Sequence, residues 1–302
     1  MFEINAKNMN LLTGFKGKFL TSYLKNPIIL SEVIGNELEK VYQLHEELME
    51  KPLEKSGKHR KINWSSGWLE NREKFKNGNV EALIPGYVDK FDYFRIDGKF
   101  MRGKSGTEIR LQYSLLLGAI EKVLSRFKIT RIIEFGCGTA HNLVFLSKLY
   151  PNINFVGSDW THAFKEIIKL FNKSLQSNIS AGPEFDFFNP DYSFQLFEND
   201  LIFTCGALEQ VGKNHVEFTD FLISKKIGCV VNIEPEVELL TNENRFDLTS
   251  KLYIEKRGYL NGYLNELRRR EVEGKIEILH MSRSNIGAFP CDGWSLFIWR
   301  PI

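Results

Sequence analysis

The residues best suited to bind a ligand lie within residues 129–160, which combine two acids with closely spaced glycines: Glu134, Gly136, Gly138 and Asp159. An apolar run precedes each acid, and a helical pattern separates the glycines from Asp159. This order predicts a strand, a glycine loop, a helix and a second strand. The glycines let the loop backbone approach a ligand closely, and the Asp159 carboxylate can accept hydrogen bonds from two ribose hydroxyls.

The acid that precedes the glycines indicates which kind of ligand the loop binds. A dinucleotide site has the pattern G-x-G-x-x-G and holds a pyrophosphate at a helix N-terminus. Glu134 would repel a pyrophosphate, whereas it suits a ligand that carries a sulfonium or an ammonium group. S-adenosylmethionine (SAM) carries both groups together with a ribose. An ordinary strand-to-helix turn in another kind of α/β protein is the alternative interpretation.

These residues resemble motif I and the following acidic motif of class I SAM-dependent methyltransferases, with Ala140 where the family usually has a third glycine. The resemblance implies that Glu134 organises the methionine end of SAM. It also implies that Gly136 and Gly138 pass beneath the ligand and that Asp159 binds its ribose.

The same resemblance implies three further contacts to SAM, made by Trp160, Asn189 and Cys205. Trp160 would flank the adenine. Asn189 would hydrogen-bond the adenine edge, with a turn residue ahead of Pro190 as the alternative interpretation. The backbone around Cys205 would border the sulfonium. We do not expect the Cys205 thiol to act as a nucleophile, because methyl transfer from SAM needs none.

An acceptor hydroxyl is a weak acid, so methyl transfer to its oxygen is helped by a base that takes the proton. His215, shortly after the fourth predicted strand, is the first candidate, with a histidine capping the next helix as the alternative. Glu234, at the end of the fifth predicted strand, is the second, with structural hydrogen bonding as the alternative. We interpret His141, just past the glycine loop, as a first-turn helix residue, with an acceptor-side base as the alternative, and His280 as structural. The sequence carries no clear acidic triad of the kind that holds magnesium in catechol-type enzymes, so we expect no metal.

The surrounding pattern predicts an α/β fold. Strands alternate with helices except at the end, so we expect a Rossmann-like, seven-stranded, mostly parallel sheet with an antiparallel C-terminal hairpin. The expected strands are Ile132-Ile133, Phe155-Val156, Phe185–Phe188, Asp200–Gly206, Gly228–Pro235, Lys275–Met281 and Trp294–Trp299. The expected helices include residues 111–123, residues 164–175 with Thr161 as their cap, residues 216–223 and a long helix over Leu252–Val272.

Residues 1–105 lack a sheet pattern, and we expect them to form a mostly helical cap over the carboxyl ends of the strands. Residues 106–302 would then be the SAM-binding domain. Ser31 is expected to cap a helix that ends before Pro52. The aromatic rings of residues 62–105 are expected either to line a substrate pocket or to pack on the next domain. Residues 55–61 (KSGKHRK) are interpreted as a solvated linker, with a phosphate-binding patch as the alternative.

The composition is that of an ordinary globular protein, with 302 residues, 43% hydrophobic and 26% charged. The formal net charge of +2 gives no global reason to expect nucleic acid or an anionic membrane as a partner. The sequence has no apolar run of membrane-spanning length and no signal-peptide pattern. Its four cysteines are widely spaced, which favours a reduced cytoplasmic protein.

The C-terminal residues 293–301 resemble the last strand of bacterial sugar O-methyltransferases and related small-molecule enzymes. We therefore expect SAM-dependent methyl transfer to a hydroxyl of a sugar or a secondary metabolite. A nucleic-acid or protein methyltransferase and a non-catalytic SAM-fold subunit are the alternatives. The fourth predicted strand does not end in the Asp/Asn-Pro-Pro-aromatic motif of amino-methylating enzymes, and Cys205 lacks the following proline of cytosine C5 enzymes. The sequence leaves the oligomeric state open, a homo-oligomer included.

Overall fold

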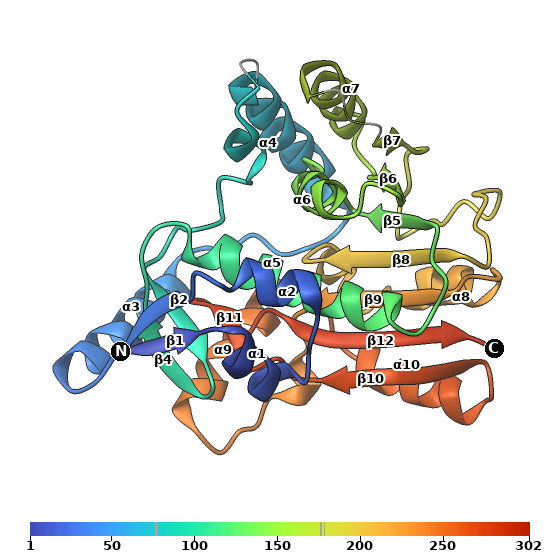
Figure 1. Ribbon diagram of the computed structural model, residues 1–302. Helices are drawn as coiled ribbons and strands as arrows, with labels where there is room; N and C mark the ends of the chain where they lie inside the picture. Colours follow the sequence, from blue (N-terminus) through green and yellow to red (C-terminus); the bar gives the residue numbers. More distant parts are fainter. Residues whose placement is uncertain (76–77, 176, 178) are drawn as a thin grey trace.

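The computed structural model describes residues 1–75, 78–175, 177 and 179–302, and its largest element is a seven-stranded sheet (Figure 1). The strands lie side by side in the order β10 (Ile276–Ser282), β12 (Ser295–Pro301), β9 (Cys229–Glu234), β8 (Asp200–Cys205), β5 (Arg131–Phe135), β6 (Asn154–Ser158) and β7 (Ser180–Ala181). Neighbours run parallel from β9 to β7, whereas β12 is antiparallel to both β9 and β10. The predicted Rossmann-like α/β class and the antiparallel pairing of the last two strands are therefore confirmed.

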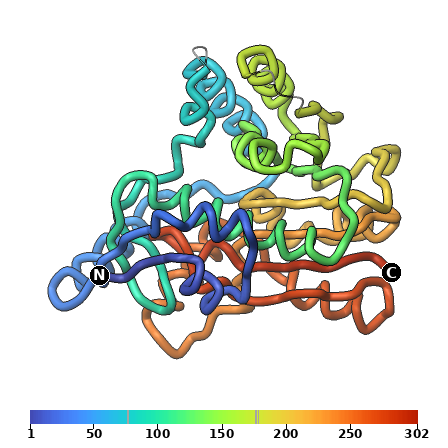
Figure 2. Tube along the Cα trace, in the orientation of Figure 1, coloured from blue at the N-terminus to red at the C-terminus, as the bar shows by residue number. Residues whose placement is uncertain are grey.

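Helices cover both faces of this sheet, because successive side chains of its central strands point to opposite faces and both sets are apolar. On β5, Ile132 belongs to one buried cluster and Ile133 to the other. The Ile132 cluster includes side chains of α5 (Thr107–Leu124), α6 (His141–Leu149) and α7 (Ala163–Leu175). The Ile133 cluster includes side chains of α8 (Val216–Ile223) and α10 (Tyr263–Val272). Figure 2 follows the Cα trace in the same view, with these helices crossing the strands of the sheet.

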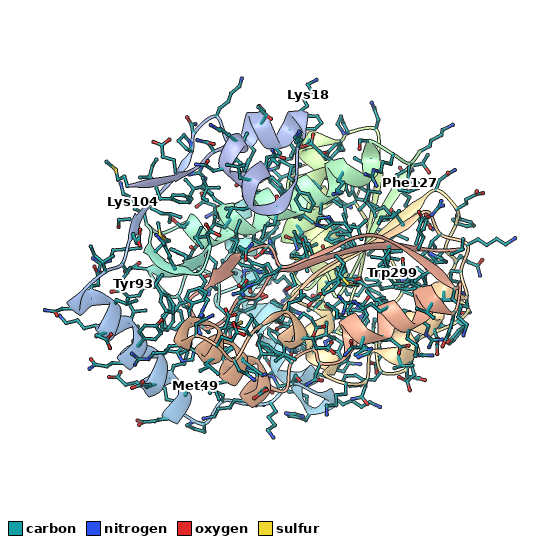
Figure 3. All side chains as sticks on the ribbon, turned by 90° about the horizontal axis from the view of Figure 1, so that it is seen from below. Lys18, Met49, Tyr93, Lys104, Phe127 and Trp299 are labelled. Atoms are coloured by element: carbon teal, nitrogen blue, oxygen red, sulfur yellow. The ribbon has the colours of Figure 1, made fainter. Side chains whose placement is uncertain are left out.

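A buried polar contact fixes the antiparallel strand to its neighbours. Trp299 on β12, labelled in Figure 3, is fully buried and donates its indole N–H to Asn232 Oδ1 on β9 at 3.0 Å. The Tyr263 hydroxyl of α10 donates to the same oxygen at 2.8 Å. Each buried donor therefore has a partner, which avoids the free-energy cost of burying an unpaired polar group.

The N-terminal segment contains helices and also an antiparallel sheet that the sequence did not predict. Its helices are α1 (Ala6–Thr13), α2 (Lys18–Tyr23), α3 (Asn36–Glu50) and α4 (Lys61–Lys74). Its sheet has the order β1 (Phe2–Ile4), β2 (Ile28–Glu32), β4 (Lys99–Arg102), β3 (Tyr93–Ile96) and β11 (Ile286–Ala288). Because β11 comes from the far end of the chain, residues 1–105 do not complete this sheet alone. The division into domains at residue 105 stays a prediction.

One buried arginine joins this second sheet to the C-terminal part of the chain. Arg95 on β3 is 1% exposed and donates to three oxygens: Phe289 O, Phe246 O and Thr249 Oγ1. Two of these acceptors belong to α9 (Arg245–Arg257). Neutral oxygens and the rings of Phe100 and Phe246 surround the cation, so burial lowers the pKa of Arg95 to about 10.

Helix α4 brings the N-terminal segment to the carboxyl edge of the seven-stranded sheet. It packs against α7, and in Figure 1 it stands on the side toward which β5 and β8 point. Trp68 of α4 belongs to the same buried cluster as the inner faces of α5, α6 and α7. This helix therefore covers the end of the sheet where open α/β folds bind ligands.

Four predicted elements differ from the structure. The third strand is Ser180–Ala181, and residues 185–188 form a loop that Phe185 anchors in the core. Ser31 lies inside β2, and the following helix begins at Asn36, although it does end before Pro52. The long C-terminal helix is two helices, α9 and α10, because Gly258 adopts the left-handed conformation and ends α9. Thr161 was expected to cap the helix over residues 164–175. In the structure α7 begins at Ala163, two residues later, and Thr161 donates its backbone N–H and its hydroxyl to Asp159 Oδ1.

Short 3-10 turns connect several of these elements: η1 (Lys58–Arg60), η3 (Val80–Leu83), η4 (Leu208–Val211) and η5 (Val237–Leu239). Within the described part of the chain, no helix is long and apolar enough to cross a membrane.

Candidate functional site

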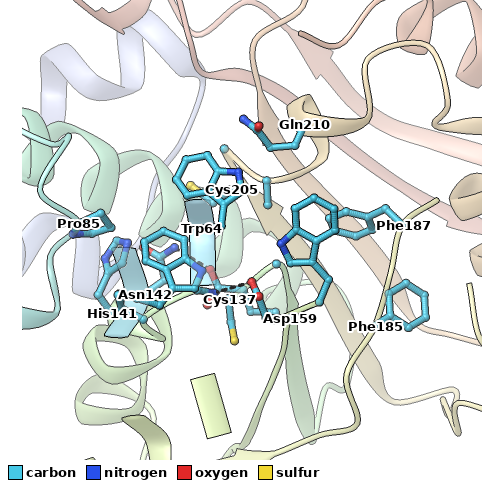
Figure 4. A pocket seen from close by; sticks show the side chains of 18 of the residues that line it. Trp64, Pro85, Cys137, His141, Asn142, Asp159, Phe185, Phe187, Cys205 and Gln210 are labelled. Atoms are coloured by element: carbon cyan, nitrogen blue, oxygen red, sulfur yellow. Dashed lines mark hydrogen bonds between the residues drawn. The ribbon is translucent and has the colours of Figure 1, made fainter. Parts of the chain in front are cut away.

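A pocket lies where β5, β6 and β8 end, beneath α4 (Figure 4), and it encloses about 690 Å³ of empty space when its open mouth is included. Six of the seven residues predicted to bind the cofactor line the pocket: Glu134, Gly136, Gly138, Asp159, Trp160 and Cys205. Residues from distant parts of the chain complete its walls: Trp64, Trp68, Pro85, Tyr87, His141, Asn142, Asp186, Phe187, Ala207 and Gln210. The sheet therefore gathers the predicted acids and glycines at one place.

Asp159 follows β6 and is held by the loop that precedes it. Its Oδ2 accepts the Gly138 N–H at 3.1 Å, and its Oδ1 accepts the backbone N–H and the hydroxyl of Thr161, both at 2.8 Å. The side chain is 4% exposed, and burial raises the pKa of Asp159 above its ordinary value. The Oδ2 atom accepts one bond from the protein, so it keeps a lone pair for a hydroxyl of a ligand.

Glu134 ends β5 with one carboxylate oxygen satisfied and the other without a partner. Asn142 Nδ2 donates to Oε1 at 2.7 Å, and Gln112 Nε2 in turn donates to Asn142 Oδ1 at 3.4 Å, which fixes the amide (Figure 4). Among the described residues, Oε2 is buried and has no hydrogen-bond partner. Burial raises the pKa of Glu134 well above its ordinary value. A buried carboxylate oxygen that lacks a protein donor can accept a hydrogen bond from a ligand.

The glycine loop needs glycines for two reasons, its backbone conformation and its neighbours. Gly136 and Gly138 have φ values of +74° and +53°. A Cβ on Gly136 would lie 2.4 Å from Ala207 Cβ, and one on Gly138 would lie 2.8 Å from Trp68 Cζ2. Ala140 adopts a φ of +60° directly before α6, a left-handed conformation that an alanine reaches at a modest cost.

The aromatic wall opposite the glycine loop comes from the N-terminal segment. Trp64 and Trp68 stack with ring centroids 5.2 Å apart, and Tyr87 meets Trp64 edge-on at 5.9 Å. In the described structure, the indole Nε1 atoms of both tryptophans are buried without a hydrogen-bond partner. The sequence signal for this wall was the i, i+4 spacing of Trp64 and Trp68, but the sequence left open whether the rings line a pocket or pack on a domain.

Asn189 lies away from the pocket, because the strand before it is placed differently, and its contact to the adenine stays a prediction. Asn189 is exposed in a turn and is not among the described residues that line the pocket. The loop after β7 presents Asp186 and Phe187 to the pocket instead. Asp186 Oδ1 accepts the Phe188 N–H at 2.9 Å, which holds this loop in shape. Asp186 was missed because the apolar run around it was interpreted as strand.

Neither predicted base lines the pocket. His215 is 4% exposed, its Nε2 is 3.1 Å from Asn261 O, and its ring packs on Tyr263. Its side chain makes no capping hydrogen bond to α8. Glu234 accepts the backbone N–H groups of Ala207, Leu208 and Glu209 at 3.1–3.2 Å. It therefore holds the loop after β8, and that loop supplies Ala207 and Gln210 to the pocket.

Cys205 reaches the pocket without being activated. Burial, together with the carboxylates of Glu234 and Glu134, raises the pKa of the Cys205 thiol well above its ordinary value. Its Sγ accepts from Gln112 Nε2 at 3.5 Å. A thiol with a raised pKa is a poor nucleophile, which agrees with the prediction that Cys205 does not act as one.

The charged side chains that line the pocket are acidic, while Arg60 over the Trp64 ring and Lys61 near Asp159 lie just outside the lining. Three carboxylates line it, those of Glu134, Asp159 and Asp186, and no lysine or arginine is among the described lining residues. Such a pocket disfavours phosphates and favours a cation. The geometry therefore separates this site from nucleotide sites that hold a pyrophosphate.

No known protein-family model matches the sequence, and comparison with curated proteins finds no relative. Solved structures with some likeness include that of the plantazolicin methyltransferase BpumL in complex with SAH (S-adenosylhomocysteine) and a desmethyl plantazolicin analogue. Its sequence is 13% identical, the match covers 87% of this chain and 98% of that chain, and the TM-score is 0.45. PigF with SAH is 12% identical over 88% of this chain and 71% of that chain, with a TM-score of 0.43. An O-methyltransferase family 2 protein from Planctomyces limnophilus with apigenin is 10% identical over 57% and 50%, with a TM-score of 0.40.

Proposed function

We propose that this protein is a SAM-dependent methyltransferase that acts on a small molecule. The observation that carries the proposal is the unpartnered Oε2 of Glu134, buried in a pocket whose described lining has carboxylates and no cationic side chain. A ligand with an ammonium group satisfies this oxygen and offsets the cost of burying its charge. SAM has that group and a sulfonium, and Asp159 lies beside the same glycine loop to bind its ribose.

The remaining walls fit the rest of SAM. Trp160 and Phe187 offer flat faces for an adenine, and the Asp186 carboxylate can accept from an exocyclic amine. The unpartnered Nε1 of Trp68, next to Gly138, is a donor for the methionine carboxylate. When bound, SAM supplies an activated methyl group, and the protein's task is to align an acceptor and receive its proton.

The acceptor we propose is a small molecule with a hydroxyl group, such as a sugar or a secondary metabolite. The support is the lining of the pocket by Trp64, Pro85 and Tyr87, which encloses the space under α4 with aromatic and apolar side chains, as in small-molecule sites. Tryptophan faces pack equally well against sugar rings and against planar rings. A nucleic-acid strand or a protein segment would need a longer, open groove.

Calorimetry tests the cofactor and a turnover assay tests the acceptor. We expect SAM and SAH to bind the full-length protein, and NAD and ATP not to bind. Formation of SAH is then measured with nucleotide sugars, free sugars and simple phenols, and with RNA and histone-like peptides as the opposing set. Absence of SAM and SAH binding would refute the cofactor, and methylation confined to RNA or peptides would refute the small-molecule acceptor.

A further inference from the structure

His141 is the one histidine of the six in this chain that is among the described residues lining the pocket. It is the first residue of α6, directly after the glycine loop, and it is 7% exposed. Figure 4 places it beside Asn142 and Trp64, on the opposite side of Asp159 from Phe187. His141 therefore lies away from the proposed adenine wall, toward the space under Pro85 and Trp64 that an acceptor can occupy.

A tyrosine from a different helix holds the His141 ring. Tyr113 on α5 has its hydroxyl 3.1 Å from His141 Nδ1 and 3.4 Å from the His141 carbonyl oxygen. The Tyr113 ring stacks on Phe145 with centroids 4.0 Å apart and an interplanar angle of 0°. Since Phe145 is one helical turn beyond His141, α6 fixes both the tyrosine ring and the histidine that it contacts.

The second ring nitrogen, Nε2, is without a protein partner in the described structure. It makes no hydrogen bond to the described residues, and it is not fully buried. Nε2 therefore keeps some accessible surface, on a residue that lines the pocket. If the Tyr113 hydroxyl donates to the His141 carbonyl, its oxygen accepts the Nδ1 proton, and the Nε2 lone pair faces the pocket.

We propose that His141 Nε2 accepts the proton of the methyl acceptor, and that Tyr113 is the positioning residue that selects the Nδ1–H tautomer. This inference rests on the proposed methyltransferase function. In the reaction, an acceptor oxygen forms a bond to the methyl carbon while the carbon–sulfur bond breaks and its electron pair stays on sulfur, giving SAH. The acceptor O–H bond breaks, and its proton passes to Nε2, giving an imidazolium.

The environment of His141 is consistent with this role. Burial lowers the pKa of His141 to about 4, so the ring enters the reaction neutral. A sulfonium in the same pocket favours the tautomer that turns a lone pair toward it. An imidazole with a lowered pKa takes a proton more readily from an acidic hydroxyl, such as a phenol or an enol, than from a simple alcohol.

Nitrogen NMR of the full-length protein labelled at histidine tests the tautomer without any acceptor. With SAH bound, the His141 signals, assigned by their loss in His141→Gln, should show a proton on Nδ1 and a bare Nε2. A proton on Nε2 would overturn the proposal. In Tyr113→Phe the tautomer should shift toward Nε2–H, whereas an unchanged tautomer would remove Tyr113 from the positioning role.

Turnover gives the second, independent reading. For any nucleotide sugar or simple phenol that the wild-type protein methylates, His141→Gln should lower kcat by about a hundred- to ten-thousandfold and leave SAH affinity unchanged. His280→Gln is the matched control, since His280 on β10 contacts Lys122 and Ser282 and is not among the described pocket residues; it should keep full turnover. Retained turnover in His141→Gln would refute the proposal, whereas failure of the wild type to bind SAH would refute the proposed function.

Discussion

The indole ring of Trp68 lies where a side chain on residue 138 would be, since a Cβ built on Gly138 would be 2.8 Å from Trp68 Cζ2. Trp68 comes from α4 in the N-terminal segment, and Gly138 belongs to the loop after β5. The contact joins two parts of the chain that are 70 residues apart in the sequence. The ligand-binding loop is thus shaped by the helix that covers it.

This contact predicts that Gly138→Ala is more damaging than the loss of a glycine alone. The new methyl group would meet the Trp68 ring, and a φ of +53° strains any side chain, so we expect destabilisation of about 2–4 kcal/mol together with loss of SAH binding. Gly274→Ala is the control, because Gly274 has a φ of +69° and nothing within 4 Å of its Cβ position. Thermal unfolding and calorimetry of both variants check this, and equal losses in the two would contradict it.

Asp159→Ala should weaken SAM and SAH while the protein stays folded. Losing hydrogen bonds from ribose hydroxyls to a carboxylate costs roughly 1.5–3 kcal/mol, or about ten- to a hundredfold in affinity. Asp191→Ala is the matched control, because Asp191 is exposed in the loop after β7 and only accepts a turn hydrogen bond from Ser193. Calorimetric titration with SAH gives the answer, and unchanged affinity in a folded Asp159→Ala protein would remove Asp159 from the ribose site.

Binding of SAM should release a proton, because Glu134 changes its ionisation. Burial raises the pKa of Glu134, so the ligand-free carboxyl holds its proton at pH values where an ordinary glutamate is ionised. A neighbouring ammonium or sulfonium stabilises the carboxylate and lowers this pKa. Below the ligand-free pKa, binding therefore expels a proton, and affinity rises with pH until that pKa is passed.

Calorimetry in two buffers of different ionisation enthalpy measures the released proton. Glu134→Gln should abolish the release and weaken binding by roughly tenfold. Glu108→Gln should leave the release intact, since Glu108 also has a pKa raised by burial, to about 7, but is not among the described residues of the pocket. A buffer-independent binding enthalpy in the wild type would show that Glu134 does not respond to the ligand.

The parts of the site that the sequence predicted are those encoded by short-range spacing. Glu134, Gly136, Gly138 and Asp159 lie within 26 consecutive residues, and a strand, a loop and a helix of ordinary length place them together. Asn189 does not line the pocket, because its expected position depended on a strand directly before it. The apolar run Phe185–Phe188 has the pattern of a strand, yet Phe185 is buried against Phe135 from within a loop.

The parts that the sequence missed depend on contacts between distant segments. The N-terminal sheet has strands of only three to five residues, and it is completed by β11, which pairs with β3 about 190 residues away. No local pattern reveals such a partner. His215 lies outside the pocket for a related reason. The turn η4 follows β8 and brings Gln210 to the pocket, whereas the His215 ring packs against Tyr263.

His215→Gln should therefore keep turnover, in contrast to the prediction from chain position. The variant removes a hydrogen bond to Asn261 O and part of a buried ring contact, so we expect a loss of stability of about 1–2 kcal/mol. SAH affinity and kcat should stay within about threefold of wild type, a change of less than 1 kcal/mol. A loss of kcat of the size that general-base removal causes, in a protein with normal SAH affinity, would restore His215 as the base.

The last prediction concerns Glu234 and the pH dependence of stability. Burial raises the pKa of Glu234 to about 7, against an ordinary value of 4.5. A raised folded-state pKa means that the folded protein holds this proton more tightly than the unfolded chain does. The resulting contribution to stability is fully present below the unfolded-state pKa and is lost as the pH rises through the folded-state pKa. The wild type should thus lose about 2.5 kcal/mol through this group between pH 5 and pH 8, at roughly 1.36 kcal/mol for each pKa unit.

Glu234→Gln cannot ionise, so its stability should lack this part of the decline. At about pH 5 the variant should be less stable than the wild type by roughly 1–2 kcal/mol, because an amide cannot accept all three N–H groups of the loop after β8. By about pH 8 the difference should shrink or reverse, since only the wild type has lost its contribution from Glu234. Urea unfolding at both pH values measures the change. A stability difference that widens with pH would mean that the folded-state pKa of Glu234 is lowered, and that the three backbone donors outweigh burial.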